Sequence, residues 1–113
     1  MRILKADVIE RYDACRSKLA SFKAEWPKGM PVTRKSLDRA HELGIGIVDW
    51  EWFLSESLSE SFFNMYCTDT CTLIGHLLRG ELRPMEYVAI KLEWVYHYLL
   101  GIKKAQLHAG MPD

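Results

Sequence analysis

The chain has 113 residues, of which 49% are hydrophobic and 27% charged, and this composition excludes an intrinsically disordered protein and fits one domain. Its formal net charge is zero, which makes it a poor general binder of duplex nucleic acid. Three cysteines, no signal-peptide pattern and no apolar run of about 20 residues exclude a disulfide-stapled secreted domain and a membrane-spanning segment. We therefore expect one soluble, cytoplasmic domain over residues 1–113, with a short frayed tail at 108–113 and no membrane contact.

The first segment repeats apolar residues at helical spacing and predicts one continuous helix over residues 3–26. Steps of three and four residues connect its stripe, which consists of Leu4, Val8, Tyr12, Cys15, Leu19, Phe22 and Trp26. Pro27 ends the helix, because the residue before a proline is pushed out of the α region. A loop over residues 28–31 follows, and the chain shows no credible β-hairpin.

Two short helices are predicted in the middle of the chain, over residues 34–43 and 50–56. Thr33 is the expected cap of the first short helix. The apolar run 45–48 alternates like a strand but finds no partner strand, so we expect a buried linker there. Asp49 is the expected cap of the second short helix.

Two long helices complete the prediction, over residues 58–79 and 84–107. The run Ser57–Glu60 has the form of a capping box for the first long helix. The expected inner face of that helix is a stripe that consists of Phe63, Cys67, Cys71, Ile74 and Leu78. Threonines in its middle favour a kink or a break. The second long helix has an apolar heptad register that starts at Met85. The sequence thus predicts an all-α, single-domain bundle of four to five helices.

Apolar and aromatic side chains lie on most faces of the last predicted helix. Such a helix is either a central core helix or an oligomer interface. Three aromatic residues outside its heptad stripe, Tyr87, Trp94 and Tyr98, form the candidate interface of a homodimer. The sequence leaves open whether this apolar surface meets the protein's own helices or a second copy.

Two cysteines one helical turn apart, Cys67 and Cys71, raise the question of a metal site. His76 follows them, but structural zinc commonly uses two close pairs of ligands, and the fourth ligand would be the distant Cys15 or Asp69. Small polarizable cysteines also fill apolar stripes well. We therefore assign the two cysteines to the core and predict neither a metal nor a cofactor.

Motifs for catalysis are missing from the sequence. Glu93 and His97 lack the Glu-x-x-His spacing of a di-iron bundle, so we interpret them as an exposed ion pair. The chain has neither a Gly-x-Ser-x-Gly motif nor a glycine-rich phosphate loop. An enzyme or metal protein with a site assembled between helices stays as the third hypothesis for the function.

Charge is distributed unevenly along the chain. Residues 1–39 carry ten Lys or Arg against five Asp or Glu, whereas residues 40–78 carry six Asp or Glu and no Lys or Arg. The segment 49–56 combines three acidic with three aromatic residues. Tryptophan is a typical interface anchor, and acidic side chains steer a basic partner. The candidate partner-binding residues are Asp49, Trp50, Glu51, Trp52, Glu56 and Glu60.

These features favour a small non-catalytic protein-binding module that docks on a basic partner through the acidic aromatic segment 49–60. An inhibitor or adaptor fits this description, of the kind represented by immunity proteins, antitoxins and phage- or plasmid-borne accessory proteins. The alternative is a nucleic-acid-binding transcriptional regulator with a basic patch over 28–39, whose candidate residues are Lys28, Arg34, Lys35 and Arg39. A solvated positive face is the simpler interpretation of that patch in a chain without net charge.

Overall fold

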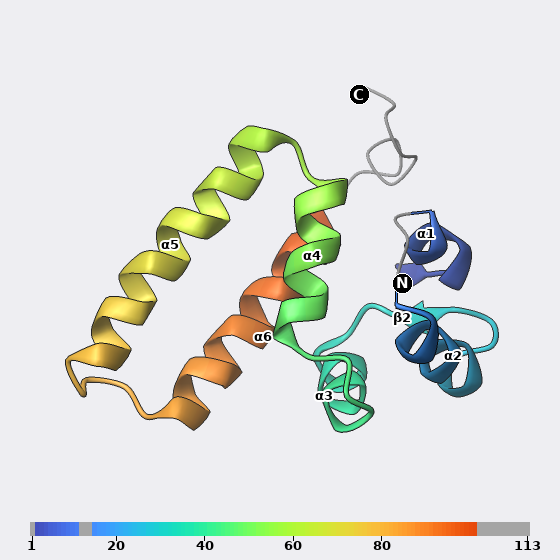
Figure 1. Cartoon of the computed structure of the whole chain (residues 1–113), viewed down its shortest axis with the longest axis horizontal. Coiled ribbons are helices and arrows are strands. Elements are labelled where there is room, and N and C mark those ends of the chain that lie inside the picture. The colour runs from blue at the N-terminus through green and yellow to red at the C-terminus, as the bar shows by residue number, and fades with distance from the viewer. Residues whose placement is uncertain (1, 12–14, 102–113) are drawn as a thin grey trace.

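Six α-helices and one pair of two-residue strands make up residues 2–11 and 15–101, which are the part of the chain that the computed structural model describes (Figure 1). In chain order the elements are β1 (Ile3–Leu4), α1 (Ala6–Glu10), α2 (Arg16–Glu25), β2 (Met30–Pro31), α3 (Arg34–Glu42), α4 (Ile47–Ser57), α5 (Glu60–Leu78) and α6 (Pro84–Gly101). The architecture confirms the predicted all-α bundle, to which a small antiparallel sheet is added.

The single helix predicted over residues 3–26 is wrong. β1 pairs antiparallel with β2, and α1 and α2 are separate helices on either side of residues 12–14, which lie outside the described part. Leu4 and its strand partner Met30 are 4% and 0% exposed, so the strand pair carries both side chains into the core. Pairing with a distant segment decides the conformation of β1, and local residue spacing holds no information about that pairing.

The turn before β2 depends on Gly29, which has a φ of +104°. A Cβ on this residue would lie 2.5 Å from Ile3 Cγ2 in β1. We expect Gly29→Ala to destabilise the protein by more than the ~1–2 kcal/mol that the left-handed conformation alone costs, because the Ile3 side chain in β1 also has to move. Gly44→Ala is the matched control, since Gly44 has a φ of +87° with nothing within 4 Å of its Cβ position. Urea unfolding measures both variants, and an equal loss would mean that the contact with β1 is irrelevant.

Local capping fixes the starts of α3 and α4. Thr33 Oγ1 accepts a hydrogen bond from the Ser36 amide at 3.1 Å, which confirms the predicted cap of α3. α4 begins at Ile47, earlier than predicted, because Gly46 is its N-cap. The carboxylate of Asp49 accepts a hydrogen bond from the Gly46 amide at 2.9 Å, so Asp49 acts from the third helical position.

Two further expectations at the ends of α4 are wrong. Residues 45–48 are not a buried linker, because Val48 belongs to α4 and is 77% exposed. Ser57 does not cap α5 but ends α4, where its hydroxyl donates a hydrogen bond to the Phe53 carbonyl at 2.7 Å. The N-cap of α5 is Ser59 and not Ser57, and α4 begins about one turn earlier than predicted. Both boundaries were misplaced because several residues there can cap a helix.

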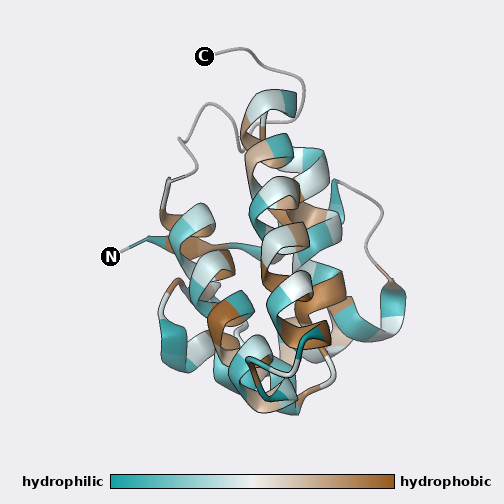
Figure 2. Ribbon diagram, turned by 90° about the vertical axis from the view of Figure 1, so that its left-hand side faces the viewer, coloured by the Kyte–Doolittle hydropathy of each residue, from teal (hydrophilic) through white to brown (hydrophobic). Residues whose placement is uncertain are grey.

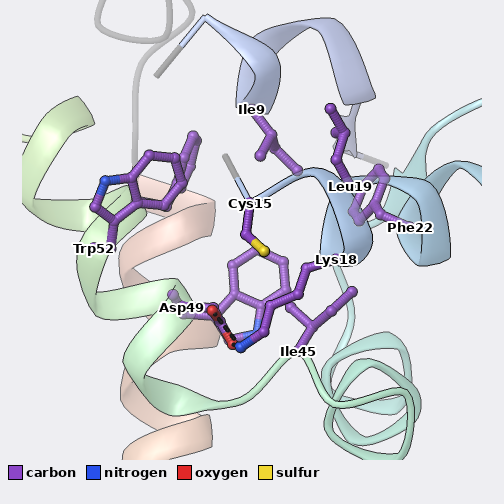
Figure 3. A pocket seen from close by; sticks show the side chains of 10 residues that line it. Ile9, Cys15, Lys18, Leu19, Phe22, Ile45, Asp49 and Trp52 are labelled. Atoms are coloured by element: carbon purple, nitrogen blue, oxygen red, sulfur yellow. Dashed lines mark hydrogen bonds and ion pairs between the residues drawn. The ribbon is translucent and has the colours of Figure 1, made fainter. Parts of the chain in front are cut away.

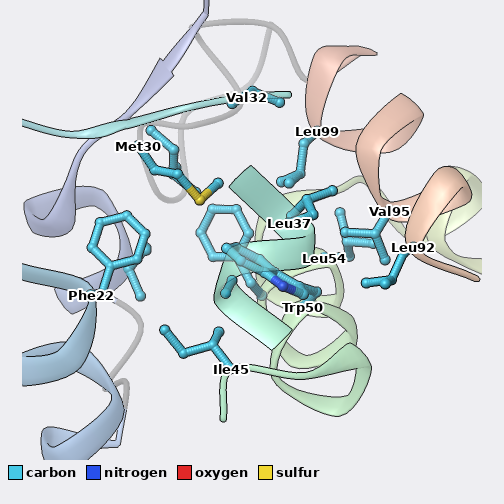
Figure 4. Close-up of a cluster of buried hydrophobic side chains, with 14 of the residues drawn as sticks. Phe22, Met30, Val32, Leu37, Ile45, Trp50, Leu54, Leu92, Val95 and Leu99 are labelled. Carbon is cyan, nitrogen blue, oxygen red and sulfur yellow. The ribbon is translucent and has the colours of Figure 1, made fainter. Parts of the chain in front are cut away.

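The core surrounds α4 (Figure 4). Trp50, Phe53 and Leu54 of this helix are all at most 2% exposed. In Figure 4, Leu92, Val95 and Leu99 of α6 lie on one side of the cluster, and Phe22 and Met30 of the N-terminal elements lie on the other. Burial of each such side chain stabilises the fold by about 1.5–3 kcal/mol. α4 therefore joins the N-terminal elements to the long helices.

α5 is a continuous helix, without the predicted break, and lies at the outside of the molecule (Figure 1). Its fully buried residues are Tyr66 and Leu73. The stripe predicted as its inner face is wrong, because Cys67 and Cys71 are exposed and Leu78 is 81% exposed. α5 carries two overlapping apolar stripes, and helical period alone cannot decide which one faces the core.

α6 begins at Pro84 as predicted and is described as far as Gly101. Residues 102–107 of the predicted helix and the predicted tail at 108–113 lie outside the described part. Among the described helices, none combines the length and the apolar character needed to span a membrane.

Candidate functional site

A buried lysine lies where α4, α5 and α6 meet. Lys91 of α6 is 0% exposed, and its Nζ donates hydrogen bonds to Glu51 Oε2 of α4 at 2.7 Å and to Thr70 Oγ1 of α5 at 2.6 Å. The Tyr66 hydroxyl of α5 donates to the same Glu51 oxygen at 2.9 Å. The Lys91 ammonium also lies 4.1 Å from the centre of the Tyr66 ring. We call Glu51, Tyr66, Thr70 and Lys91 the buried polar cluster, in which Lys91 and Tyr66 are buried, Thr70 is partly buried and the Glu51 side chain is 31% exposed.

Electrostatics in the buried polar cluster keep Tyr66 neutral. Burial raises the pKa of its phenol above the usual range, and the negative charge of Glu51 and the hydrogen bond to that carboxylate act in the same direction. The phenol is therefore a permanent hydrogen-bond donor at neutral pH. Because Lys91 has no exposed surface, its amine is not available to a ligand. The arrangement joins three helices and offers no accessible nucleophile.

We did not predict this cluster from the sequence, and Glu51 was a predicted partner-binding residue instead. A usable signal existed, because Lys91 lies three residues after Val88 and four before Val95, on the apolar face of α6. A lysine in such a position needs a buried acidic partner. The segment 40–78, with acidic residues and no cations, was the place to look for one.

The structure does not bring the six predicted partner-binding residues together on one surface. Trp50 is 2% exposed in the core, and its indole N–H has no hydrogen-bond partner among the described residues. Both carboxylate oxygens of Asp49 accept hydrogen bonds from Lys18 Nζ at 2.8 Å. Glu56 and Glu60 are exposed, and Trp52 is partly buried. Asp49 and Glu51 are therefore paired within the chain, and Trp50 is part of the core.

Trp52 lies at one side of a small pocket of about 50 Å³ between α4 and the N-terminal helices (Figure 3). Ile9 and Leu19 lie across the pocket from it, and the Lys18–Asp49 ion pair is at its border. The walls are largely apolar, so the pocket suits a small hydrophobic group.

Cys15 also lines this pocket. The prediction that it lies in the core stripe of a helix is wrong. It is the N-cap of α2, and its thiol is exposed. The Ser17 hydroxyl, 3.3 Å from the sulfur, and the backbone amides of Lys18 and Ser17 lower the pKa of this thiol. The thiol therefore has more anionic character than an ordinary exposed cysteine.

The candidate nucleic-acid residues are only partly free. Arg34 pairs with Glu93 at 3.0 Å and with Asp38 at 3.3 Å. Arg39 pairs with Glu25 at 3.1 Å. Lys28 and Lys35 are exposed. Because carboxylates already pair with both arginines, the positive field of this surface is weaker than the sequence indicated.

The Glu93–His97 pair is confirmed at 3.2 Å, on the surface of α6. Of the three aromatic residues proposed for a dimer, Trp94 and Tyr98 contact Tyr66 of the chain's own α5, and all three are partly buried. The Tyr66 ring centre lies 5.2 Å from that of Tyr98 and 6.5 Å from that of Trp94, both in edge-on geometry. Tyr87 is partly buried, and burial and the charge of Glu51 raise the pKa of its phenol. Trp94 and Tyr98 thus help to hold α5 on α6.

No set of three or more His, Cys, Asp or Glu side chains is positioned to bind a metal ion within residues 2–11 and 15–101. His76 contacts Glu81 and Arg79 through its Nδ1. No protein-family model, curated protein or solved structure matches the chain.

Proposed function

We propose that this protein is a small non-catalytic protein-binding domain, an inhibitor or adaptor, that docks on a basic partner in the cytoplasm through the outer face of α4. We define this face by Val48, Trp52 and Glu56, which are four residues apart and therefore lie on one side of the helix. Val48 is 77% exposed, and Glu56 is exposed without an ion pair among the described residues.

Trp52 is the observation that carries the proposal. A partly buried tryptophan beside an apolar pocket is held in place, and it offers a large contact area at little cost in side-chain entropy. Tryptophans in such positions dominate the binding energy of many interfaces. Glu56, one turn further along α4, adds the negative charge that favours a basic partner. This surface is narrower than the one predicted from the sequence, because Asp49 and Glu51 pair with Lys18 and Lys91 and Trp50 is buried in the core.

The test compares the wild type with Trp52→Ala/Glu56→Lys. Partners are captured from a native host extract, with and without nuclease, and the recovered protein is then titrated against each variant. We expect the double variant to bind at least about 30-fold more weakly, which is the effect of losing a hot-spot residue. Met85→Ala/Glu86→Lys makes similar changes at the start of α6 and is expected to bind as the wild type does.

Two outcomes would contradict the proposal. One is unchanged affinity of the Trp52→Ala/Glu56→Lys variant for the captured protein, with a native circular dichroism spectrum. The other is a recovery that disappears with nuclease and falls steeply with salt, since this behaviour is typical of the nucleic-acid-binding alternative.

A further inference from the structure

α5 carries an apolar stripe that is exposed from Cys67 to Leu78, while the first residue of the stripe, Phe63, packs against the core. We define the α5 stripe as Phe63, Cys67, Cys71, Ile74 and Leu78. Phe63 is partly buried, both cysteines are exposed, Ile74 is 37% exposed and Leu78 is 81% exposed. Steps of four, four, three and four residues keep these side chains on one face. Figure 2 views the molecule from the side on which α5 lies.

The α5 stripe is also free of charge. Between Ser61 and Leu78 the residues able to carry a charge at neutral pH are Asp69 and His76. At about 3.6 residues per turn both lie on the opposite side of the helix from the stripe. A surface helix normally places charged side chains on its exposed face, so a neutral, apolar face over this length indicates a contact surface.

We propose that the α5 stripe is the interface of a homodimer, in which two copies of α5 pack antiparallel across a twofold axis. A twofold interface requires one patch to fit itself, and a neutral apolar stripe does so without repulsion. The ends also match in charge. Glu60 at the start of α5 is exposed without an ion pair among the described residues, and Arg83, just beyond its end, is exposed. Antiparallel packing places the Glu60 of each copy near the Arg83 of the other, and opposes the two helix dipoles favourably.

The size of the α5 stripe sets the strength of this dimer. At a rise of about 1.5 Å per residue the stripe is roughly 24 Å long, and at a helix width of about 10 Å its footprint is roughly 240 Å². This is well below the roughly 800 Å² per partner of a standard stable interface. The dimer is therefore weak, and its population depends on protein concentration. The inference is independent of the proposed function, because α4 contributes no residue to it.

Sedimentation of the full chain from about 1 µM to about 500 µM is the first test, and we expect the mass to rise from that of a monomer toward that of a dimer. Ile74→Lys/Leu78→Lys is expected to weaken the association at least tenfold, with an unchanged circular dichroism spectrum. Met65→Lys is the matched control, because Met65 is 56% exposed on another face of α5. It is expected to associate as the wild type does.

Thiol cross-linking tests the antiparallel register. Cys71 lies close to the middle of the stripe, so the twofold axis brings the two copies of this residue together. We expect oxidation of a Cys15→Ser/Cys67→Ser variant to give a cross-linked dimer, whereas a Cys67→Ser/Cys71→Ser variant, which keeps the exposed Cys15, gives none above background. A monomer at every concentration overturns the proposal. So does a dimer that persists in Ile74→Lys/Leu78→Lys, or one that Met65→Lys weakens equally.

Discussion

Replacement of Lys91 by alanine is expected to cost about 2–5 kcal/mol of the free energy of unfolding, which is the typical loss when a long buried side chain is truncated to alanine. Glu51 would keep its negative charge beside a cavity, and Thr70 would lose its hydrogen-bond partner on α6. Native domains are stable by about 5–15 kcal/mol, so the variant would be close to unfolding. Urea unfolding followed by circular dichroism at 222 nm measures the loss.

Two control variants separate lost pairing from lost side-chain volume. Lys35→Ala removes an exposed lysine and is expected to change stability by less than about 0.5 kcal/mol. Glu51→Gln/Lys91→Met removes both charges, keeps most of the volume and leaves an amide oxygen that can accept a hydrogen bond from the Tyr66 hydroxyl, so it is expected to be more stable than Lys91→Ala. If Lys91→Ala lost no more stability than Lys35→Ala, the buried polar cluster would have no role in holding α5.

The two tryptophans of α4 are expected to respond very differently to truncation. Trp50→Ala removes a side chain that is 2% exposed in the centre of the core, and we expect a loss of about 3–5 kcal/mol. Trp52→Ala removes a partly buried side chain at the border of a pocket, and we expect a loss of about 1 kcal/mol. Urea unfolding of each variant provides the comparison.

Trp50→Phe refines this contrast, because it keeps most of the ring and removes the unpartnered indole N–H. Burying a polar group without a partner costs roughly 1–3 kcal/mol. Removal of the indole N–H therefore offsets part of the stability that is lost because the smaller ring leaves a cavity. The result that would refute the assignment of Trp50 to the core is a smaller loss in Trp50→Ala than in Trp52→Ala.

Those elements that local chemistry defines were predictable from the sequence. The starts of α3 and α6 depend on Thr33 and Pro84, which act within one turn of the helix they begin. β1 was not predictable in this way, since its two residues become a strand only through pairing with β2. The local spacing of Leu4 and Val8 fits a helix equally well, and a long-range contact decides between the two structures.

The candidate surface was predictable only in part, for a related reason. The sequence places Trp50 and Trp52 on different faces of one helix, but which face turns inward depends on the packing of α4 against α6. The same holds for α5, where Tyr66 rather than Cys67 faces the core because its hydroxyl reaches Glu51. The sequence also does not show which acidic residues form ion pairs within the chain. In the structure Lys91 pairs with Glu51 and Lys18 pairs with Asp49.

Because Lys91 is completely buried, the rate at which its amine is chemically modified reports how often α5 separates from the other helices. Acylating reagents modify exposed lysines such as Lys28 and Lys35 directly, but they reach Lys91 only while the contact between α5 and the other helices is open. When reclosing is faster than acylation and the freed amine reacts as an exposed lysine does, its relative rate of modification equals the fraction of molecules that are open. Each tenfold slowing corresponds to about 1.4 kcal/mol of opening free energy. A single side chain thus reports the local stability of the α4–α5–α6 junction in the unmodified sequence.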